Sequence, residues 1–419
     1  MNRNEIEIMA PAGSYESLMA AIQGGADSVY FGAEELNMRA ASSINFTLDD
    51  LRNIVKICRE NGVKSYLTVN VVLFDNEIER MHRIIDASVS SGVSAIIASD
   101  LSVINYAFSS GIEVHLSTQL NISNTEALKF YSKWADVVVL AREVNLDQVK
   151  HIHKEIIAQD LRGPRSGLVK IEMFVHGALC MAISGKCYLS LHENIMSANR
   201  GKCYQTCRKS YLVTEKESGY QLEIGNEYIM SPKDLCTIGF VDKLIDSGVS
   251  VFKIEGRARS AEYVKTVVSC YDEAVKAVSD GSYTENRIQE WRSRLASVFN
   301  RGFWDGYYLG QKLGEWTTRY GSRATKRKVY LGKVTNFFTR LNVAEIKLEN
   351  GDLVKGETVL ITGPTTGAIE YRVDELRVDL KETGKALKGE LCSIKVNDYL
   401  RRSDKVYKWI DATDSADRS

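Results

Sequence analysis

The chain has 419 residues, too many for one ordinary hydrophobic core, so we expect one large domain and one small one. Lysine plus arginine and aspartate plus glutamate number 54 each, which excludes an overall field that attracts nucleic acid or membranes, so any charged partner must bind a local patch. No stretch approaches the ~18 apolar residues of a membrane span, and the N-terminus lacks an apolar signal core, so we expect a soluble, cytoplasmic protein.

The first 260 residues repeat one pattern, in which an amphipathic helix ends at glycine and a short apolar run follows. Eight such runs occur in order: IEIMA, SVYFG, SYLTVNVV, SAIIAS, EVHLST, DVVVLA, KIEMFVH and VFKIEG. Parallel strands that are covered on both faces have this nearly continuous apolar character. We therefore predict an α/β fold with a (β/α)8 TIM-like barrel, and a doubly wound open sheet is the competing interpretation.

The regular spacing breaks between the seventh and eighth runs. More than seventy residues separate His176 from Ser250, whereas one repeat takes ~30. This insertion, at about 178–236, contains five of the eight cysteines and a predicted hairpin formed by YLVTE and YQLEIGNEYIM. Ser231, Pro232 and Asp234 predict the start of a helix. Two long polar helices, at roughly 259–280 and 285–298, follow the eighth strand.

From about Lys328 the apolar pattern alternates, which predicts a separate all-β barrel or sandwich. We assign residues 1–310 to the barrel domain, 311–327 to a basic linker, 328–410 to the small β-domain and 411–419 to a tail. Around the end of the linker lie five cationic residues: Arg319, Arg323, Lys326, Arg327 and Lys328. They indicate either a solvated linker or a contact surface for a phosphate backbone.

Active sites of such barrels gather at the carboxyl ends of the strands. The candidate catalytic residues there are His176, Glu255 and Asn70. The candidate substrate-binding residues at the same ends are Arg39, Gln119, Arg142, Glu143, Lys253 and Arg257. Several arginines at one mouth suit an anionic ligand, although some of them can instead pair with Glu143 and Glu255. A histidine after a buried strand is also often a packing residue rather than a base.

The clustered cysteines follow the spacing C-x6-C-x15-C-x3-C-x28-C from Cys180 through Cys187, Cys203 and Cys207 to Cys236. This is neither a zinc-ribbon pattern nor a ferredoxin run. Spacing alone indicates a soft-metal site or redox thiols, and both zinc and an iron–sulfur cluster suit four thiolates. We expect Cys236 to begin a helix, whose N-terminus would favour the thiolate. The remaining cysteines, Cys58, Cys270 and Cys392, are predicted to be buried apolar residues.

The segments EMFVHGALCMAISGKCYLS, NRGKCYQTCRKSY, SPKDLC and KIEGRARSAEYV resemble the signature of the peptidase U32 family of collagenase-like proteases. The resemblance covers essentially the whole chain, and length and layout are most similar to the bacterial tRNA hydroxylation branch. It implies hydroxylation of the wobble uridine at carbon 5, with prephenate as co-substrate and the tRNA anticodon loop as partner. It also implies a [4Fe-4S] cluster on Cys180, Cys187, Cys203 and Cys236, with Cys207 as the alternative ligand.

Under this resemblance, Arg39, Arg142 and Arg257 would bind the dicarboxylate, and the basic residues near the linker would contact tRNA. Two other readings stay open. One is a U32-type peptidase with His176 as base, although the chain has no H-E-x-x-H or G-x-S-x-G motif. The other is a non-catalytic binding module in which the cluster, or a zinc ion, only pins the insertion to the barrel.

Overall fold

The structure is a computed structural model that describes residues 2–41, 45–195, 197–209, 211–224, 231–311, 314–317 and 321–412. Eight parallel strands close into a barrel, because the last of them pairs with both the first and the seventh. The strands are β1 (Glu7–Pro11), β2 (Ser28–Phe31), β3 (Lys64–Val69), β4 (Ala95–Ala98), β5 (Glu113–Leu116), β6 (Val137–Val139), β7 (Lys170–Gly177) and β11 (Val249–Ile254). All eight predicted strands are confirmed, and the open sheet is excluded.

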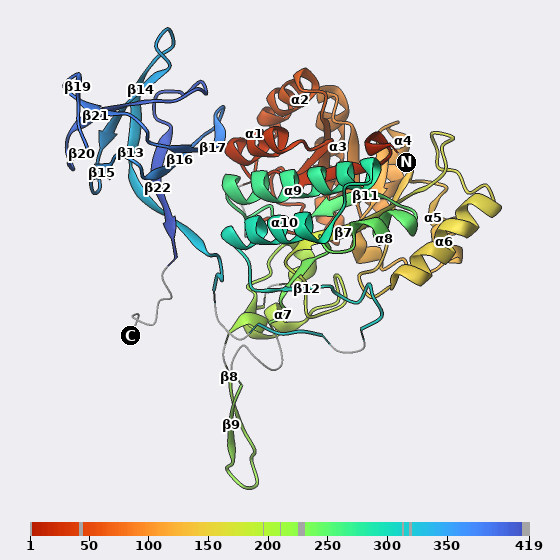
Figure 1. Cartoon of the computed structure of the whole chain (residues 1–419). Helices are drawn as coiled ribbons and strands as arrows, with labels where there is room; N and C mark the ends of the chain where they lie inside the picture. Colours follow the sequence, from red (N-terminus) through yellow and green to blue (C-terminus); the bar gives the residue numbers. More distant parts are fainter. Residues whose placement is uncertain are drawn as a thin grey trace.

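Helices surround this barrel, as Figure 1 shows. They are α1 (Tyr15–Gly24), α2 (Leu51–Glu60), α3 (Ile78–Ser91), α4 (Leu101–Ser109), α5 (Thr125–Tyr131), α6 (Leu146–Ala158), α8 (Val241–Asp246), α9 (Ala261–Asp280) and α10 (Glu285–Ser297). Side chains of Ser14 and Asn145 cap the starts of α1 and α6. The two long helices after the eighth strand are confirmed. No helix in the described part of the chain is long and apolar enough to cross a bilayer.

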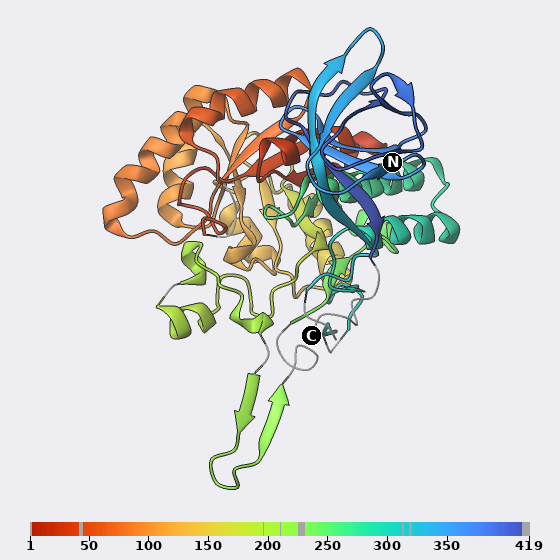
Figure 2. The ribbon, with the colours of Figure 1, turned by 90° about the vertical axis from the view of Figure 1, so that its left-hand side faces the viewer.

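The insertion returns to the mouth of the barrel after leaving it. It contains the short helix α7 (Leu189–Asn194) and the predicted hairpin of β8 (Tyr211–Thr214) and β9 (Gln221–Ile224), which extends away from the barrel in both views (Figures 1 and 2). Strand β10 (Asp234–Cys236) then pairs antiparallel with the end of β7, and β12 (Phe303–Trp304) pairs with β10.

The helix predicted from Ser231, Pro232 and Asp234 is therefore wrong. These residues lead into β10, and the next helix, α8, begins only at Val241. Leu235 and Cys236 are buried and pair with Gly177 and His176. Ladder hydrogen bonds and burial against β7 outweigh the local capping signal, which describes only the chain's own preference.

The C-terminal residues form an antiparallel eight-stranded sheet in the order β17-β16-β22-β13-β14-β21-β18-β19. Its strands are β13 (Lys326–Phe338), β14 (Val343–Leu348), β16 (Thr358–Gly363), β17 (Gly367–Arg372), β18 (Leu376–Val378), β19 (Lys381–Glu382), β21 (Leu391–Lys395) and β22 (Lys405–Asp411), beside a small pair of β15 (Leu353–Val354) and β20 (Lys385–Ala386). Lys326 and Arg327, which we placed in the linker, lie in β13 because they pair with Asp411 and Ile410.

The β-domain packs directly against α1 and α9 (Figure 1). Ala368 and Trp409 are buried in the same apolar cluster as the barrel helices. Polar contacts also join the surfaces: Gln23 Nε2 donates to Thr366 O at 2.8 Å, the Ala368 amide donates to Gln23 Oε1 at 3.2 Å, Lys265 Nζ donates to Ala368 O at 2.7 Å, and Lys328 pairs with Glu262 at 2.8 Å. The shared core fixes the β-domain against the outside of the barrel.

Replacing Leu18 by alanine should destabilise the fold, because this α1 side chain is fully buried in the shared core. Removal of a buried leucine costs about 2–5 kcal/mol. Leu101→Ala on α4 is the matched control, since Leu101 is 63% exposed and surface changes cost about 0.5 kcal/mol or less. Thermal unfolding followed by circular dichroism measures both; equal melting temperatures would contradict the packing described.

Candidate functional site

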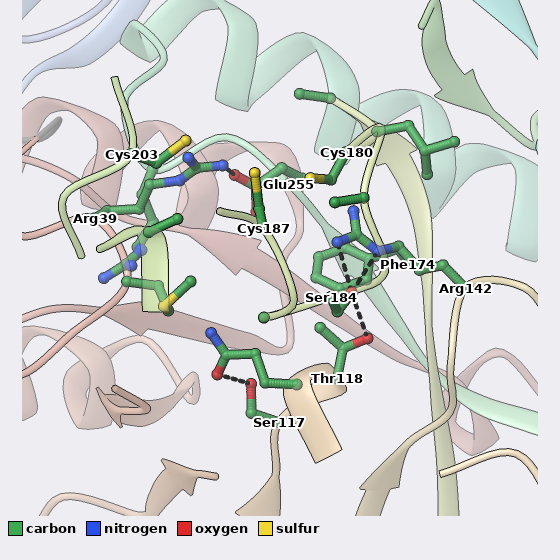
Figure 3. A pocket seen from close by; sticks show the side chains of 18 of the residues that line it. Arg39, Ser117, Thr118, Arg142, Phe174, Cys180, Ser184, Cys187, Cys203 and Glu255 are labelled. Atoms are coloured by element: carbon green, nitrogen blue, oxygen red, sulfur yellow. Dashed lines mark hydrogen bonds and ion pairs between the residues drawn. The ribbon is translucent and has the colours of Figure 1, made fainter. Parts of the chain in front are cut away.

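A cavity of about 260 Å³ lies at the carboxyl ends of the strands, between the barrel and the insertion. Figure 3 shows Cys180, Cys187 and Cys203 near the Arg39–Glu255 pair, with Arg142 and Phe174 beside them. Most of the predicted site residues line this cavity: Arg39, Asn70, Gln119, Arg142, Lys253, Glu255, Arg257, Cys180, Cys187, Cys203 and Cys207. The carboxyl ends of the barrel strands, where the site was predicted, thus bring together residues that are more than 200 positions apart in the sequence.

Arg39 and Glu255 form an ion pair across the cavity wall, with Nη2 2.5 Å from Oε1. Burial alone would raise the pKa of Glu255, but Arg39, Arg257 and Arg142 hold that pKa below its usual value. The attraction of Glu255 in turn raises the pKa of Arg39. The pair is therefore charged on both sides, and it ties the loop after β2 to the end of β11. Of the two roles considered for Arg39, binding an anionic ligand or pairing with a carboxylate, this geometry favours the ion pair.

Arg142 and Arg257 are cations without a carboxylate partner at ion-pairing distance among the described residues. Arg142 donates from Nε and Nη2 to Ser184 Oγ, at 3.1 and 2.7 Å. Arg257 donates from Nη1 to Asn37 Oδ1 at 3.0 Å and to Thr68 Oγ1 at 2.9 Å. Burial lowers the pKa of Arg257, as expected for a cation held by neutral groups. Both guanidinium groups retain N–H donors that can form hydrogen bonds to an anionic ligand.

The backbone of Arg257 is held in place by close packing against the first βα loop. A side chain at Gly13 would place its Cβ 1.9 Å from the carbonyl oxygen of Arg257. Only glycine permits this approach, and the loop after β1 can therefore pack against the segment that carries the arginine.

Lys253 forms a buried ion pair with Glu172, with 2.5 Å between Nζ and Oε1. The ammonium also lies 4.9 Å from the centre of the Tyr30 ring and 5.6 Å from that of Phe174. The second carboxylate oxygen of Glu172 has no hydrogen-bond partner in the structure. Lys253 lines the cavity with its charge already balanced by a group behind it.

Asn70 and Gln119 belong to a chain of neutral hydrogen bonds along the strand ends. Asn70 Nδ2 donates to Ser117 Oγ at 3.2 Å, and that hydroxyl donates to Gln119 Oε1 at 3.2 Å. The side-chain oxygen Oδ1 of Asn70 accepts from the backbone amide of Met38 at 3.2 Å. Because a carboxamide does not titrate, Asn70 cannot serve as a general acid or base. The amides of Asn70 and Gln119 can instead orient a ligand by hydrogen bonding.

His176 and Glu143 do not line the cavity. His176 is buried among Tyr263, Tyr271 and Phe303, and burial lowers its pKa to about 3. It is thus a neutral packing residue because β10 pairs alongside and covers the end of β7. Glu143 points into solvent in the loop after β6. The carboxyl ends of the strands pointed to both positions, and for His176 no sequence signal indicated the strand β10 that the insertion adds beside it.

The five clustered cysteines divide into two groups. Cys180, Cys187, Cys203 and Cys207 line the cavity, whereas Cys236 is buried in β10 outside that lining. Burial raises the pKa of Cys207 to about 11, and the other three cavity thiols contribute to that increase while Arg208 opposes it. In the part of the chain that the structure describes, no three His, Cys, Asp or Glu side chains are already placed to hold a metal ion.

The thiols that line the cavity include Cys207, the alternative ligand of the sequence analysis, and do not include Cys236. Four soft thiol donors on one cavity wall are chemically suited to an iron–sulfur cluster or to zinc. As predicted, Cys58, Cys270 and Cys392 are buried away from the site.

Several lining residues were not predicted: Phe174, Ser184, Arg208, Arg259 and Arg301. Arg208 follows Cys207 directly, and Arg259 follows Arg257 in GRAR, so sequence proximity to a candidate was an available signal. Arg301 pairs with Asp234 at 3.2 Å from beyond α10. No local pattern marks Arg301, because its position depends on β12 pairing with β10.

The predicted RNA-contacting cations are distributed over the start of the β-domain. Arg323 and Arg327 are exposed and have no carboxylate partner in the described ranges. Lys328 pairs with Glu262, and Lys326 lines a cleft at the domain interface. Arg319 lies outside the described residues.

Comparison with known proteins places these features in a family. The sequence model for peptidase family U32 matches residues 13–318. A protein named collagenase from Porphyromonas gingivalis is 60% identical over 98% of this chain and 99% of its own length. The tRNA hydroxylation protein P1 of Bacillus subtilis is 32% identical over 88% of this chain and 86% of its own length. A 23S rRNA 5-hydroxycytidine synthase of Escherichia coli is 33% identical over 91% of this chain and 58% of its own length. The chain belongs to peptidase family U32.

Proposed function

We propose that this protein hydroxylates a pyrimidine base of RNA in the barrel-mouth cavity, and specifically carbon 5 of the wobble uridine of tRNA. The observation that carries the proposal is that four cysteines line one cavity together with four arginines that have no carboxylate partner among the described residues, Arg142 and Arg257 among them. Relatives that are 32% and 33% identical are named for tRNA hydroxylation and for rRNA 5-hydroxycytidine synthesis. Both names describe addition of a hydroxyl group to RNA, which supports this reaction class.

Arg142 and Arg257 are the proposed binding residues for the anionic co-substrate, prephenate. A dicarboxylate can accept paired hydrogen bonds from two guanidiniums, each of which still has free donors after binding Ser184, or Asn37 and Thr68. Arg39 and Lys253 contribute less, because Glu255 and Glu172 already balance their charges. Enclosure by the insertion strengthens these electrostatic contacts, since it removes competing water.

Cys180, Cys187, Cys203 and Cys207 are the proposed ligands of a [4Fe-4S] cluster. The thiols suit this group chemically, and the loops that carry them would adjust when it binds. When bound, such a cluster would supply one-electron redox chemistry beside the arginines. Gln119 and Asn70 are then positioned to orient a base that has left its stack, since chemistry on a base requires that it be unstacked.

A peptidase is the second candidate, because the 60% identical relative is named collagenase. A thiol protease requires an imidazole within hydrogen-bond reach of the thiol. No histidine of the described residues lines the cavity, and His176 is buried and neutral.

Changing each proposed ligand to alanine should remove most of the iron from protein purified without oxygen, together with its broad visible absorption. Cys236→Ala should retain both, because Cys236 lies outside the cavity, and Cys270→Ala is a second buried control. Elemental analysis and visible spectroscopy measure the result. Iron loss in Cys236→Ala with retention in Cys207→Ala would restore the ligand set first expected, and zinc in place of iron would exclude the cluster.

Replacing Arg142 by methionine should raise the KM for the dicarboxylate about 10- to 100-fold, because a charged hydrogen-bonding pair contributes about 1.5–3 kcal/mol. RNA affinity should change little in the same variant. The control is Arg162→Met, at an exposed arginine that pairs with Asp160 far from the cavity. Steady-state kinetics with varied dicarboxylate separates the two, and an unchanged KM in Arg142→Met would count against the proposed anion site.

Neutralising Arg323 and Arg327 by glutamine should weaken tRNA binding and reduce its salt dependence, because both cations are exposed and unpaired within the described part of the chain. Lys328 is left unchanged in this variant, since it joins the two domains. Titrations at several salt concentrations measure the effect; an unchanged salt slope would remove these residues from the tRNA-binding surface.

A further inference from the structure

A four-residue sequence occurs twice in the insertion. Gly-Lys-Cys-Tyr stands at residues 185–188 and again at 201–204. Both glycines have φ of +76°, a left-handed conformation that favours glycine. Both cysteines line the cavity, while both lysines and both tyrosines are exposed. The two copies are therefore alike in structure as well as in sequence, and we call them the GKCY turns.

The two GKCY turns are held near each other by backbone contacts. The amide of Tyr204 donates to Ser190 Oγ at 3.0 Å, and Ser190 lies two residues after Tyr188. The carbonyl oxygen of Gly201 accepts from the amide of Ala41, at 3.3 Å, in the loop after β2. The second turn is thus fixed between the first turn and the barrel.

A groove of about 700 Å³ runs along the outside of the GKCY turns. Phe74, Lys186, Tyr188 and Lys202 line it, and the exposed Tyr204 lies outside its lining. The groove and the cavity share Gly185, Cys187 and Asn199 in their walls. A ligand lying in the groove is therefore adjacent to the entrance of the cavity.

The charges of the groove favour an anionic ligand. Its two carboxylates are both ion-paired: Glu77 pairs with Arg200, and Glu35 pairs at 2.9 Å with Arg80, which also contacts Glu34 at 3.5 Å. Lys186 and Lys202 have no carboxylate partner in the described ranges of the chain. The groove is locally positive although the whole chain has no net charge.

We propose that the GKCY turns bind the single strand of RNA on both sides of the base that enters the cavity. Lys186 and Lys202 contact phosphates, and Tyr188 and Tyr204 stack on the neighbouring bases. The tyrosines are suited to stacking because they are 75% and 53% exposed. Exposed aromatic rings interleaved with cations are the usual surface for single strands. This inference rests on the proposed function and adds the path of the strand.

RNA is favoured over a protein segment by the continuity of the groove with the cavity, by the unpaired lysines and by the exposed rings. A peptide would need backbone partners or a continuous apolar groove. The apolar side chains of this groove are instead accompanied by Lys186, Lys202 and the Glu77–Arg200 ion pair.

The test is the binding of a synthetic anticodon stem-loop RNA to the full chain at several salt concentrations. The double variant Tyr188→Ala/Tyr204→Ala should bind at least about tenfold more weakly, because stacking is lost on two bases. The double variant Lys186→Gln/Lys202→Gln should reduce the slope of log affinity against log salt by about 1.4, which is ~0.7 for each single-strand phosphate contact. Phe130→Ala and Lys154→Gln, on exposed positions of α5 and α6, are the matched controls and should bind as the wild type does.

The phenylalanine variants Tyr188→Phe/Tyr204→Phe should retain affinity, since they preserve the rings. Iron content and melting temperature equal to those of the wild type show that the cysteine loops are intact; if the alanine variant loses iron, the salt slope of the lysine variant decides the question. Unchanged affinity and slope in both doubles, with wild-type hydroxylation of RNA intact, would overturn the inference alone. Absence of RNA binding and hydroxylation by the wild type would overturn the proposed function as well.

Discussion

The antiparallel pairing of β10 with the end of β7 is the constraint on which the site depends. An ordinary barrel repeat would continue from β7 straight into the next helix. Here the chain makes a long excursion, and the short strand β10 brings it back to the strand that it left. The loops of the excursion therefore lie above the strand ends, where their cysteines face the arginines of the barrel. The same pairing buries His176 and Cys236 and so removes both from the cavity.

The positive charge available at the barrel mouth depends on how many of its cationic side chains already form ion pairs with carboxylates. Arg39 and Lys253 are balanced by Glu255 and Glu172, and Arg301 is balanced by Asp234. Arg142 and Arg257 are held only by neutral oxygens. A chain without net charge can thus present a strongly cationic hollow, because the compensating carboxylates lie elsewhere on its surface.

The barrel could be predicted because buried parallel strands are continuous apolar runs, and each of the eight runs became a strand. The arginines at the mouth could be predicted from the same strand ends. That Cys207 lines the cavity while Cys236 does not could not be predicted, since spacing along the chain does not report which loop faces the cavity. Arg301 and the burial of His176 depend on pairings between distant segments, which leave no local signal. The capping signal at Ser231 failed for the same reason.

The shared apolar core between α1, α9 and β17 has a consequence for the geometry of recognition. The β-domain is not joined to the barrel by a flexible linker alone, because the shared core holds it against the barrel helices. The distance from its exposed face to the barrel mouth is therefore fixed by the fold. Any ligand that contacted both surfaces would therefore have to match a fixed separation between them.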